Sequence, residues 1–186
     1  QWHISIMKTV WWRSEISEPN PENLHNYLRA KTESYSSIYK LGLDACMKKF
    51  YIKNIVYNMY LNVDVIHKTI YGVNEIEKAT IFYITASTPT RVNIKHGNLS
   101  LINQNGKINW NLYTTPDDDT LFVNGNDKEW AQFYLITKNN AFYFQTYHRL
   151  ANISCEYGRY IHMDKEGNIY TDGNDSELSK WDLIEV

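Results

Sequence analysis

Short apolar segments separated by turns make up the last thirty residues of the chain, 157–186. The residues 160–163 form one apolar segment and 169–170 form a second. Gly167 lies between them and can adopt the positive φ that tight hairpin turns require. A polar loop then leads into a last apolar segment, 181–186. This pattern predicts a hairpin, a loop and a closing strand.

The same pattern occurs one hundred residues earlier in the chain. Without a gap, 57–64 aligns with 157–164, and the same offset places Ile81 on Trp181. An agreement over so many positions without a gap indicates an internal repeat rather than two unrelated strand–turn–strand units.

A middle copy of the pattern is visible between these two. We expect its hairpin at 99–108, which contains an Asn-Gly turn, and its closing strand at 133–137. The residues between them, 111–126, have no counterpart in the other two copies and are predicted to be an insertion.

Three copies at a spacing of about forty to fifty residues predict a closed β structure built from repeats. The hairpin sequence 158–170 is similar to the one that recurs in growth-factor and fascin-type β-trefoils, and the pattern over 50–186 resembles a β-trefoil. This is the fold of ricin-type lectins, fibroblast growth factors, interleukin-1 and soybean-type inhibitors. The resemblance implies an all-β protein with three strand–hairpin–strand repeats, at about 50–86, 87–137 and 138–186. It does not select a function, because this fold carries unrelated activities.

The first 49 residues lie outside the repeats. Apolar residues alternate from Trp2 through Ile4 and Ile6, which predicts a strand. Asn20 and Pro21 are suited to the N-cap and the first position of a helix. We therefore expect an N-terminal strand and helix extension over 1–49.

Composition and charge restrict the partners. The chain has 186 residues with a net charge of −2 and no run of basic residues, which argues against nucleic-acid binding. No apolar run reaches the roughly 20 residues of a membrane-spanning helix, so no membrane span is expected. The 15 tyrosines and 6 tryptophans are numerous enough to supply both a core and a recognition surface.

Features of the sequence are compatible with a secreted glycoprotein. Cys46 and Cys155 are the two cysteines, and they allow one disulfide bond, with two buried free thiols as the alternative. Three Asn-x-Ser sequences are candidate glycosylation sites: Asn98, Asn152 and Asn174. We expect extracellular localisation.

The predicted insertion contains the candidate ligand-binding residues. Trp110 and Tyr113 offer aromatic faces that stack on sugar rings or contact a protein. Asp117, Asp118 and Asp119 offer carboxylates that accept hydrogen bonds from hydroxyl groups. The acidic run lacks the spacing and the glycine of a calcium-binding loop, so we interpret it as a solvated loop and predict no metal site.

Two signatures of trefoil families are absent from the chain. Ricin-type lectins carry Gln-x-Trp, whereas the sequence has Ser179-Lys180-Trp181 and Lys128-Glu129-Trp130. A basic cluster for heparin, typical of growth factors, is also missing. No histidine spacing, nucleophile elbow or phosphate-binding glycine loop indicates catalysis, so we predict no catalytic residue, no cofactor and no enzymatic activity.

Two functions remain. The first is a secreted recognition protein that binds a protein receptor or target through its surface loops. The second is a lectin-like protein that binds carbohydrate through loop aromatics and carboxylates. The partner in either case is an extracellular protein or glycan.

Overall fold

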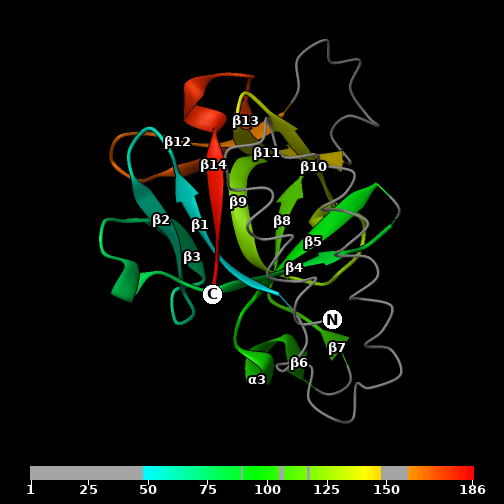
Figure 1. Cartoon of the computed structure of the whole chain (residues 1–186). Helices are drawn as coiled ribbons and strands as arrows, with labels where there is room; N and C mark the ends of the chain where they lie inside the picture. Colours follow the sequence, from blue (N-terminus) through cyan, green and yellow to red (C-terminus); the bar gives the residue numbers. More distant parts are fainter. Residues whose placement is uncertain (1–47, 89, 105–106, 117, 148–158) are drawn as a thin grey trace, which may run out of the picture.

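The computed structural model describes residues 48–186, except 89, 105–106, 117 and 148–158. In this part of the chain nearly all regular structure is β, in one twelve-stranded antiparallel sheet and one two-stranded sheet (Figure 1). The expected all-β class is therefore confirmed. The predicted N-terminal strand and helix lie outside the described residues.

The large sheet consists of three successive units of four strands. The first contains β1 (Lys49–Asn54), β2 (Met59–Asp64), β3 (Thr69–Val73) and β4 (Phe82–Ala86). The second contains β5 (Arg91–His96), β8 (Asn111–Thr115), β9 (Asp118–Gly125) and β10 (Phe133–Lys138). The third contains β11 (Ala141–Thr146), β12 (Tyr160–Met163), β13 (Ile169–Gly173) and β14 (Trp181–Glu185). A 3-10 turn precedes each fourth strand: η3 (Ile76–Lys78), η4 (Glu129–Ala131) and η5 (Glu177–Ser179).

The first and fourth strands of the three units form a closed ring. Within each unit the first strand pairs with the fourth, as β1 with β4, β5 with β10 and β11 with β14. Each fourth strand also pairs with the first strand of the next unit, and β14 returns to β1 over five residue pairs. The second and third strands of each unit form a hairpin outside this ring. A closed ring leaves none of its six strands with an open edge.

Six buried side chains, five of them aromatic, give the three units the same core. The fourth strands begin with Phe82, Phe133 and Trp181, which are cross-strand neighbours of Phe50, Val92 and Phe142. All six are buried. The predicted equivalence of Ile81 with Trp181 is therefore wrong by one residue. The first unit has three residues between its 3-10 turn and its fourth strand, whereas the other two units have one, and Phe82 occupies the core position.

The hairpin of the middle unit also differs from the expectation. The residues 99–108 form a short helix, α3 (Leu99–Ile102), and two small strands, β6 (Asn103–Gln104) and β7 (Lys107–Ile108), which pair only with each other. The second-unit hairpin is instead β8–β9, which lies within the predicted insertion. The insertion is thus 97–110 rather than 111–126. It projects at one end of the molecule, at the bottom of Figure 1.

The third hairpin and the closing strand agree with the sequence pattern. β12, β13 and β14 fall on the predicted segments, and Gly167 has the positive φ of 87° expected for the turn. The amide of Gly72 donates to the carbonyl of Gly167 at 2.7 Å, which ties this turn to β3 of the first unit.

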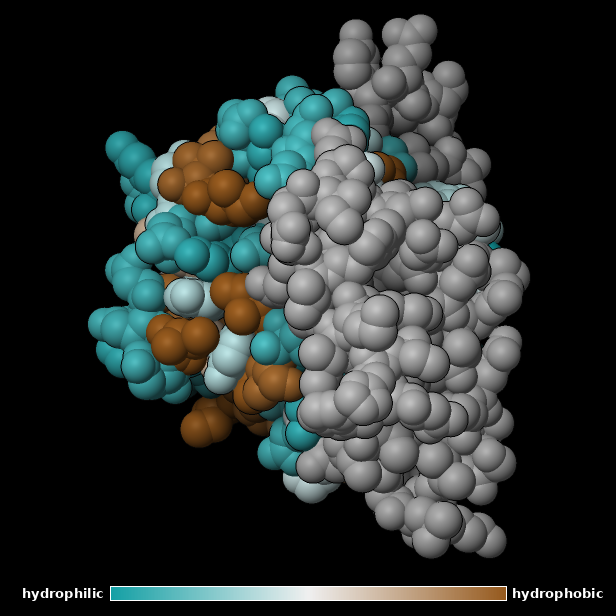
Figure 2. All heavy atoms as spheres, in the orientation of Figure 1, coloured by the Kyte–Doolittle hydropathy of each residue, from teal (hydrophilic) through white to brown (hydrophobic). Residues whose placement is uncertain are grey.

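The described residues that are visible in Figure 2 are mainly hydrophilic. Figure 2 shows apolar side chains in separate patches divided by polar ones. Over the described residues, no helix is long and apolar enough to cross a membrane.

Candidate functional site

A pocket of about 460 Å³ lies at the end of the middle hairpin, between β8, the end of β9 and η4. Two aromatic rings, two amides and one pair of opposite charges line it: Tyr113, Trp130, Asn124, Asn126, Lys128 and Glu129. Pockets of this size hold small ligands in proteins, since such sites typically span about 300–1,000 Å³.

Trp130 is exposed over 48% of its surface, although it lies between residues that anchor its turn. Ala131, the next residue, is buried, and its amide donates to the carbonyl of Lys128 at 2.9 Å. The side-chain oxygen of Asn126 accepts from the amide of Lys128 at 3.0 Å. The backbone of the turn is thus fixed, and the indole is held at the surface.

Tyr113 also lines the pocket, and its position depends on a glycine. A Cβ at Gly125 would lie 2.5 Å from Cδ1 of Tyr113, so only glycine lets the ring lie this close to β9. On the same hairpin, the Tyr113 ring stacks on Phe122 with centroids 5.2 Å apart and an interplanar angle of 24°. The ring therefore has a fixed orientation.

The buried side chain of Asn93, on β5 of the closed ring, holds η4 in place. The Asn93 side chain donates from Nδ2 to the carbonyl of Ala131 at 2.9 Å. Nearby, Nζ of the buried Lys95 donates to Oγ1 of Thr85 at 2.9 Å. Burial lowers the pKa of Lys95 to about 8, and the Asp127 carboxylate opposes this shift in part.

Trp110 lies in the core and does not line the pocket. Only 7% of its surface is exposed, and its backbone has a positive φ of 60° at the end of the 97–110 insertion. Its ring contacts the His96 ring edge-to-face with centroids 6.3 Å apart. A buried indole offers no open face to a sugar, so of the two predicted aromatics only Tyr113 belongs to the pocket.

The acidic residues lie at the opposite end of β9 from the pocket. Asp118 accepts from the amide of Thr120 at 2.8 Å, and Asp119 forms an ion pair with Arg159 at 3.6 Å. Both are exposed. Asp117 lies outside the described residues. The residues that line the pocket thus include the predicted Tyr113 but neither Asp118 nor Asp119.

The predicted modification sites are only partly described. Asn98 is exposed, and its side chain accepts from the amide of Ser100 at the start of α3. Asn174 is also exposed, in the loop before η5. Cys46, Cys155 and Asn152 lie outside the described residues. No group of three metal-ligating side chains occurs within the described part of the chain.

Asn124, Asn126 and Trp130 are pocket residues that the apolar pattern does not indicate, because polar loop residues carry no periodicity. An internal repeat does mark the loop that contains Asn126. The tetrad Asn, acidic residue, any residue, Glu begins at Asn126 and recurs at Asn74 and Asn174.

The chain matches no family profile and no curated protein sequence. Among solved structures it is similar to SeviL, which was determined bound to asialo-GM1 saccharide. The TM-score is 0.56 at 12% sequence identity, and the match covers 75% of this chain and 98% of SeviL. At this identity the similarity establishes a shared all-β fold.

Proposed function

We propose that this protein is a non-enzymatic carbohydrate-binding protein and that the pocket of Tyr113 and Trp130 holds a saccharide. The observation that carries the proposal is the exposed Trp130 indole facing a pocket with a second fixed ring and several exposed polar groups. We also propose that the fold is a β-trefoil. Three four-stranded units, a closed ring of six strands and three hairpins support this assignment.

The chemistry of the pocket suits a sugar. The apolar C–H face of a pyranose stacks on an aromatic ring, and Trp130 lines the pocket with 48% of its surface exposed. The amides of Asn124 and Asn126 both donate and accept hydrogen bonds, and the Glu129 carboxylate accepts from hydroxyl groups. Lys128 adds a hydrogen-bond donor, so the polar side chains of the pocket can bind several sugar hydroxyls at once.

The structural neighbour adds support of a different kind. SeviL has a similar fold and was solved with a saccharide bound. The binding of a protein receptor is the other function that the sequence allows, and no comparable observation among the described residues supports it.

We extend the proposal to extracellular localisation, glycosylation at Asn98, Asn152 and Asn174, and a disulfide between Cys46 and Cys155. The residue types in the sequence support this extension. Alkylation of the native, unreduced protein tests the disulfide. A mass unchanged until a reductant is added is expected, and labelling of two thiols in the folded protein would exclude the bond.

The function is tested by a glycan array with the purified, folded protein in the presence of a chelator. We expect binding that soluble sugar competes away, and we expect Trp130→Ala to abolish it without changing the thermal unfolding temperature. Tyr71→Ala is the matched control, because Tyr71 is also an exposed aromatic residue but lies on β3 of the first unit.

The outcomes are distinct. Array binding that survives Trp130→Ala would place the carbohydrate site elsewhere on the surface. No binding by a folded sample would reject the carbohydrate function and leave the protein receptor as the function to test.

A further inference from the structure

The loop that forms the pocket has a counterpart in each of the other two units. The three loops share an asparagine, an acidic residue, any residue and a glutamate that lies in a 3-10 turn, and the fourth strand follows. They begin at Asn74, Asn126 and Asn174. The amide of Ala131 donates to the carbonyl of Lys128 in the second unit, and the amide of Ser179 donates to that of Ser176 in the third. The second and third loops therefore have equivalent backbones.

The third unit also repeats the packing of a ring against a glycine. Gly173 precedes Asn174 as Gly125 precedes Asn126. A Cβ at Gly173 would lie 2.7 Å from the backbone oxygen of Tyr160 and 3.0 Å from Cδ2 of His162, so the imidazole lies close to β13 as the Tyr113 ring lies close to β9.

The second ring of each hairpin is equivalent as well. Tyr113 is paired across its hairpin with Phe122, and His162 is paired across its hairpin with Tyr170. The His162 and Tyr170 rings have centroids 5.5 Å apart and an interplanar angle of 38°. Tyr170 is exposed over 38% of its surface, so it offers an aromatic face to solvent.

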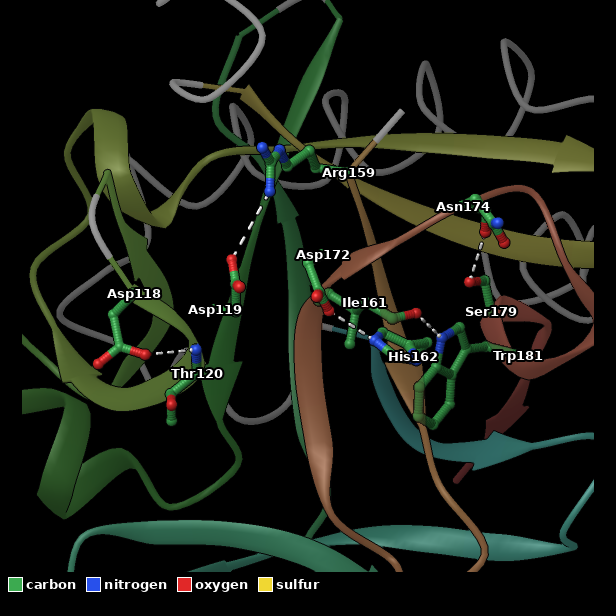
Figure 3. A network of polar contacts seen from close by, with 10 residues as sticks. All are labelled: Asp118, Asp119, Thr120, Arg159, Ile161, His162, Asp172, Asn174, Ser179 and Trp181. Carbon is green, nitrogen blue, oxygen red and sulfur yellow. Dashed lines mark hydrogen bonds and ion pairs between the residues drawn. The ribbon is translucent and has the colours of Figure 1, made fainter. Parts of the chain in front are cut away.

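Polar groups complete the arrangement in the third unit. Asp172 lies where the second unit has Asn124, and its Oδ1 is 2.8 Å from Nε2 of His162 (Figure 3). The side chain of His162 is 21% exposed and that of Asp172 is 43% exposed. The loop that follows is fixed, because Oγ of Ser179 donates to the carbonyl of Asn174 at 2.7 Å (Figure 3).

We propose that the third unit carries a second saccharide-binding site formed by His162, Tyr170, Asp172 and Asn174. The imidazole, carboxylate and amide hydrogen-bond to sugar hydroxyls, and the Tyr170 face replaces the Trp130 contact, since Leu178 occupies the tryptophan position. This inference rests on the carbohydrate-binding function proposed above.

The first unit lacks the two features on which the other sites depend. Val73 occupies the glycine position, opposite Tyr60, and Asn62 occupies the position of the ring. The Asn62 side-chain oxygen accepts from Oγ1 of Thr80 at 3.2 Å. We therefore expect two saccharide sites in each chain and not three.

Two sites have a functional consequence. A chain with one site can only coat a surface that displays many copies of a glycan. A chain with two can link two glycans, and the second contact gains from the effective concentration that the first creates.

The test is isothermal titration calorimetry of the full chain with a monovalent soluble glycan. Asialo-GM1 saccharide is the first probe, and the strongest glycan from the array is the second. We expect two sugars per chain for the wild type, one for Trp130→Ala, one for His162→Ala and none for the double variant. Lys165→Ala is the matched control, because Lys165 is an exposed residue in the turn of the same third hairpin.

Each outcome is decisive. One sugar per chain in the wild type and in His162→Ala would refute the second site and leave the proposed function standing. No heat from a folded wild-type protein with either probe would refute both. If His162→Ala does not fold, as judged by circular dichroism, Asp172→Ala replaces it with the same expected stoichiometry of one.

Discussion

Replacing the buried Lys95 with methionine should stabilise the protein at neutral pH. Lys95 is 7% exposed, and Nζ donates to Oγ1 of Thr85 at 2.9 Å and reaches Oδ1 of Asn93 at 3.5 Å. Neutral partners offset only part of the cost of removing an ammonium group from water. Burial is the main reason that its pKa falls to about 8, with Asp127 acting in the opposite direction.

The magnitude follows from the proton linkage. The ordinary lysine pKa is 10.5, so the folded state binds fewer protons than the unfolded state between about pH 8 and 10.5. Stability therefore rises with pH across this window, and the full cost, about 3 kcal/mol, applies below pH 8. Removing Lys95 also takes a donor from Thr85 and Asn93, which costs about 1–2 kcal/mol. We expect a net gain of about 1–2 kcal/mol at pH 7.

The assay is urea unfolding at pH 7, 8, 9 and 10 for the wild type and Lys95→Met. The variant should be more stable at pH 7, and its advantage should shrink by about 2 kcal/mol by pH 10. Lys53→Met is the control, since Lys53 is a partly exposed lysine on a strand of the same ring. Parallel pH curves for wild type and Lys95→Met would refute the reasoning, because the buried amine would then titrate as it does in the unfolded chain.

Three further substitutions test the packing. Gly125→Ala should displace the Tyr113 ring, costing about 1–3 kcal/mol in unfolding free energy and weakening saccharide binding in calorimetry; unchanged affinity would mean that the ring position is not needed. Trp181→Phe should lower stability by about 2–4 kcal/mol in urea, because Nε1 of the buried indole donates to the carbonyl of Ile161 at 2.9 Å; a loss below 1 kcal/mol would contradict this (Figure 3). Gly167→Ala should cost about 1–2 kcal/mol in thermal unfolding because of its φ of 87°, and an unchanged unfolding temperature would show that the turn can rearrange.

The third hairpin could be predicted from the sequence because its apolar residues alternate around a glycine turn. The middle hairpin could not. The residues 99–108 contain apolar residues and an Asn-Gly turn, which are local signals of a hairpin, but Ile102 packs into the core from a helical turn. The hairpin of the second unit is 111–125 rather than 99–108 because β8 pairs with β5 and β9 pairs with β13. Such long-range pairing leaves no local pattern in the sequence.

The candidate site, like the fold, could be predicted from the sequence only in part. Tyr113 alternates with the buried Leu112 and Thr114 on β8, so its partial exposure follows from strand periodicity. Trp110 has the same residue type as Trp130 but the opposite environment. Its burial depends on how the 97–110 insertion folds back, which residue type alone does not reveal.

The closure of the ring also bears on how the protein folds. β14 meets β1 over five residue pairs, and the amide of Val186 donates to the carbonyl of Lys49 at 2.9 Å. These partners are more than 120 residues apart in sequence, and contacts of such long range slow folding because the chain must first lose the entropy of a large loop. On the ribosome β14 is also made after every other strand of the ring. Until it arrives, β1 and β11 each expose an edge to other nascent chains, so the final strand protects the protein from aggregation as well as completing its core.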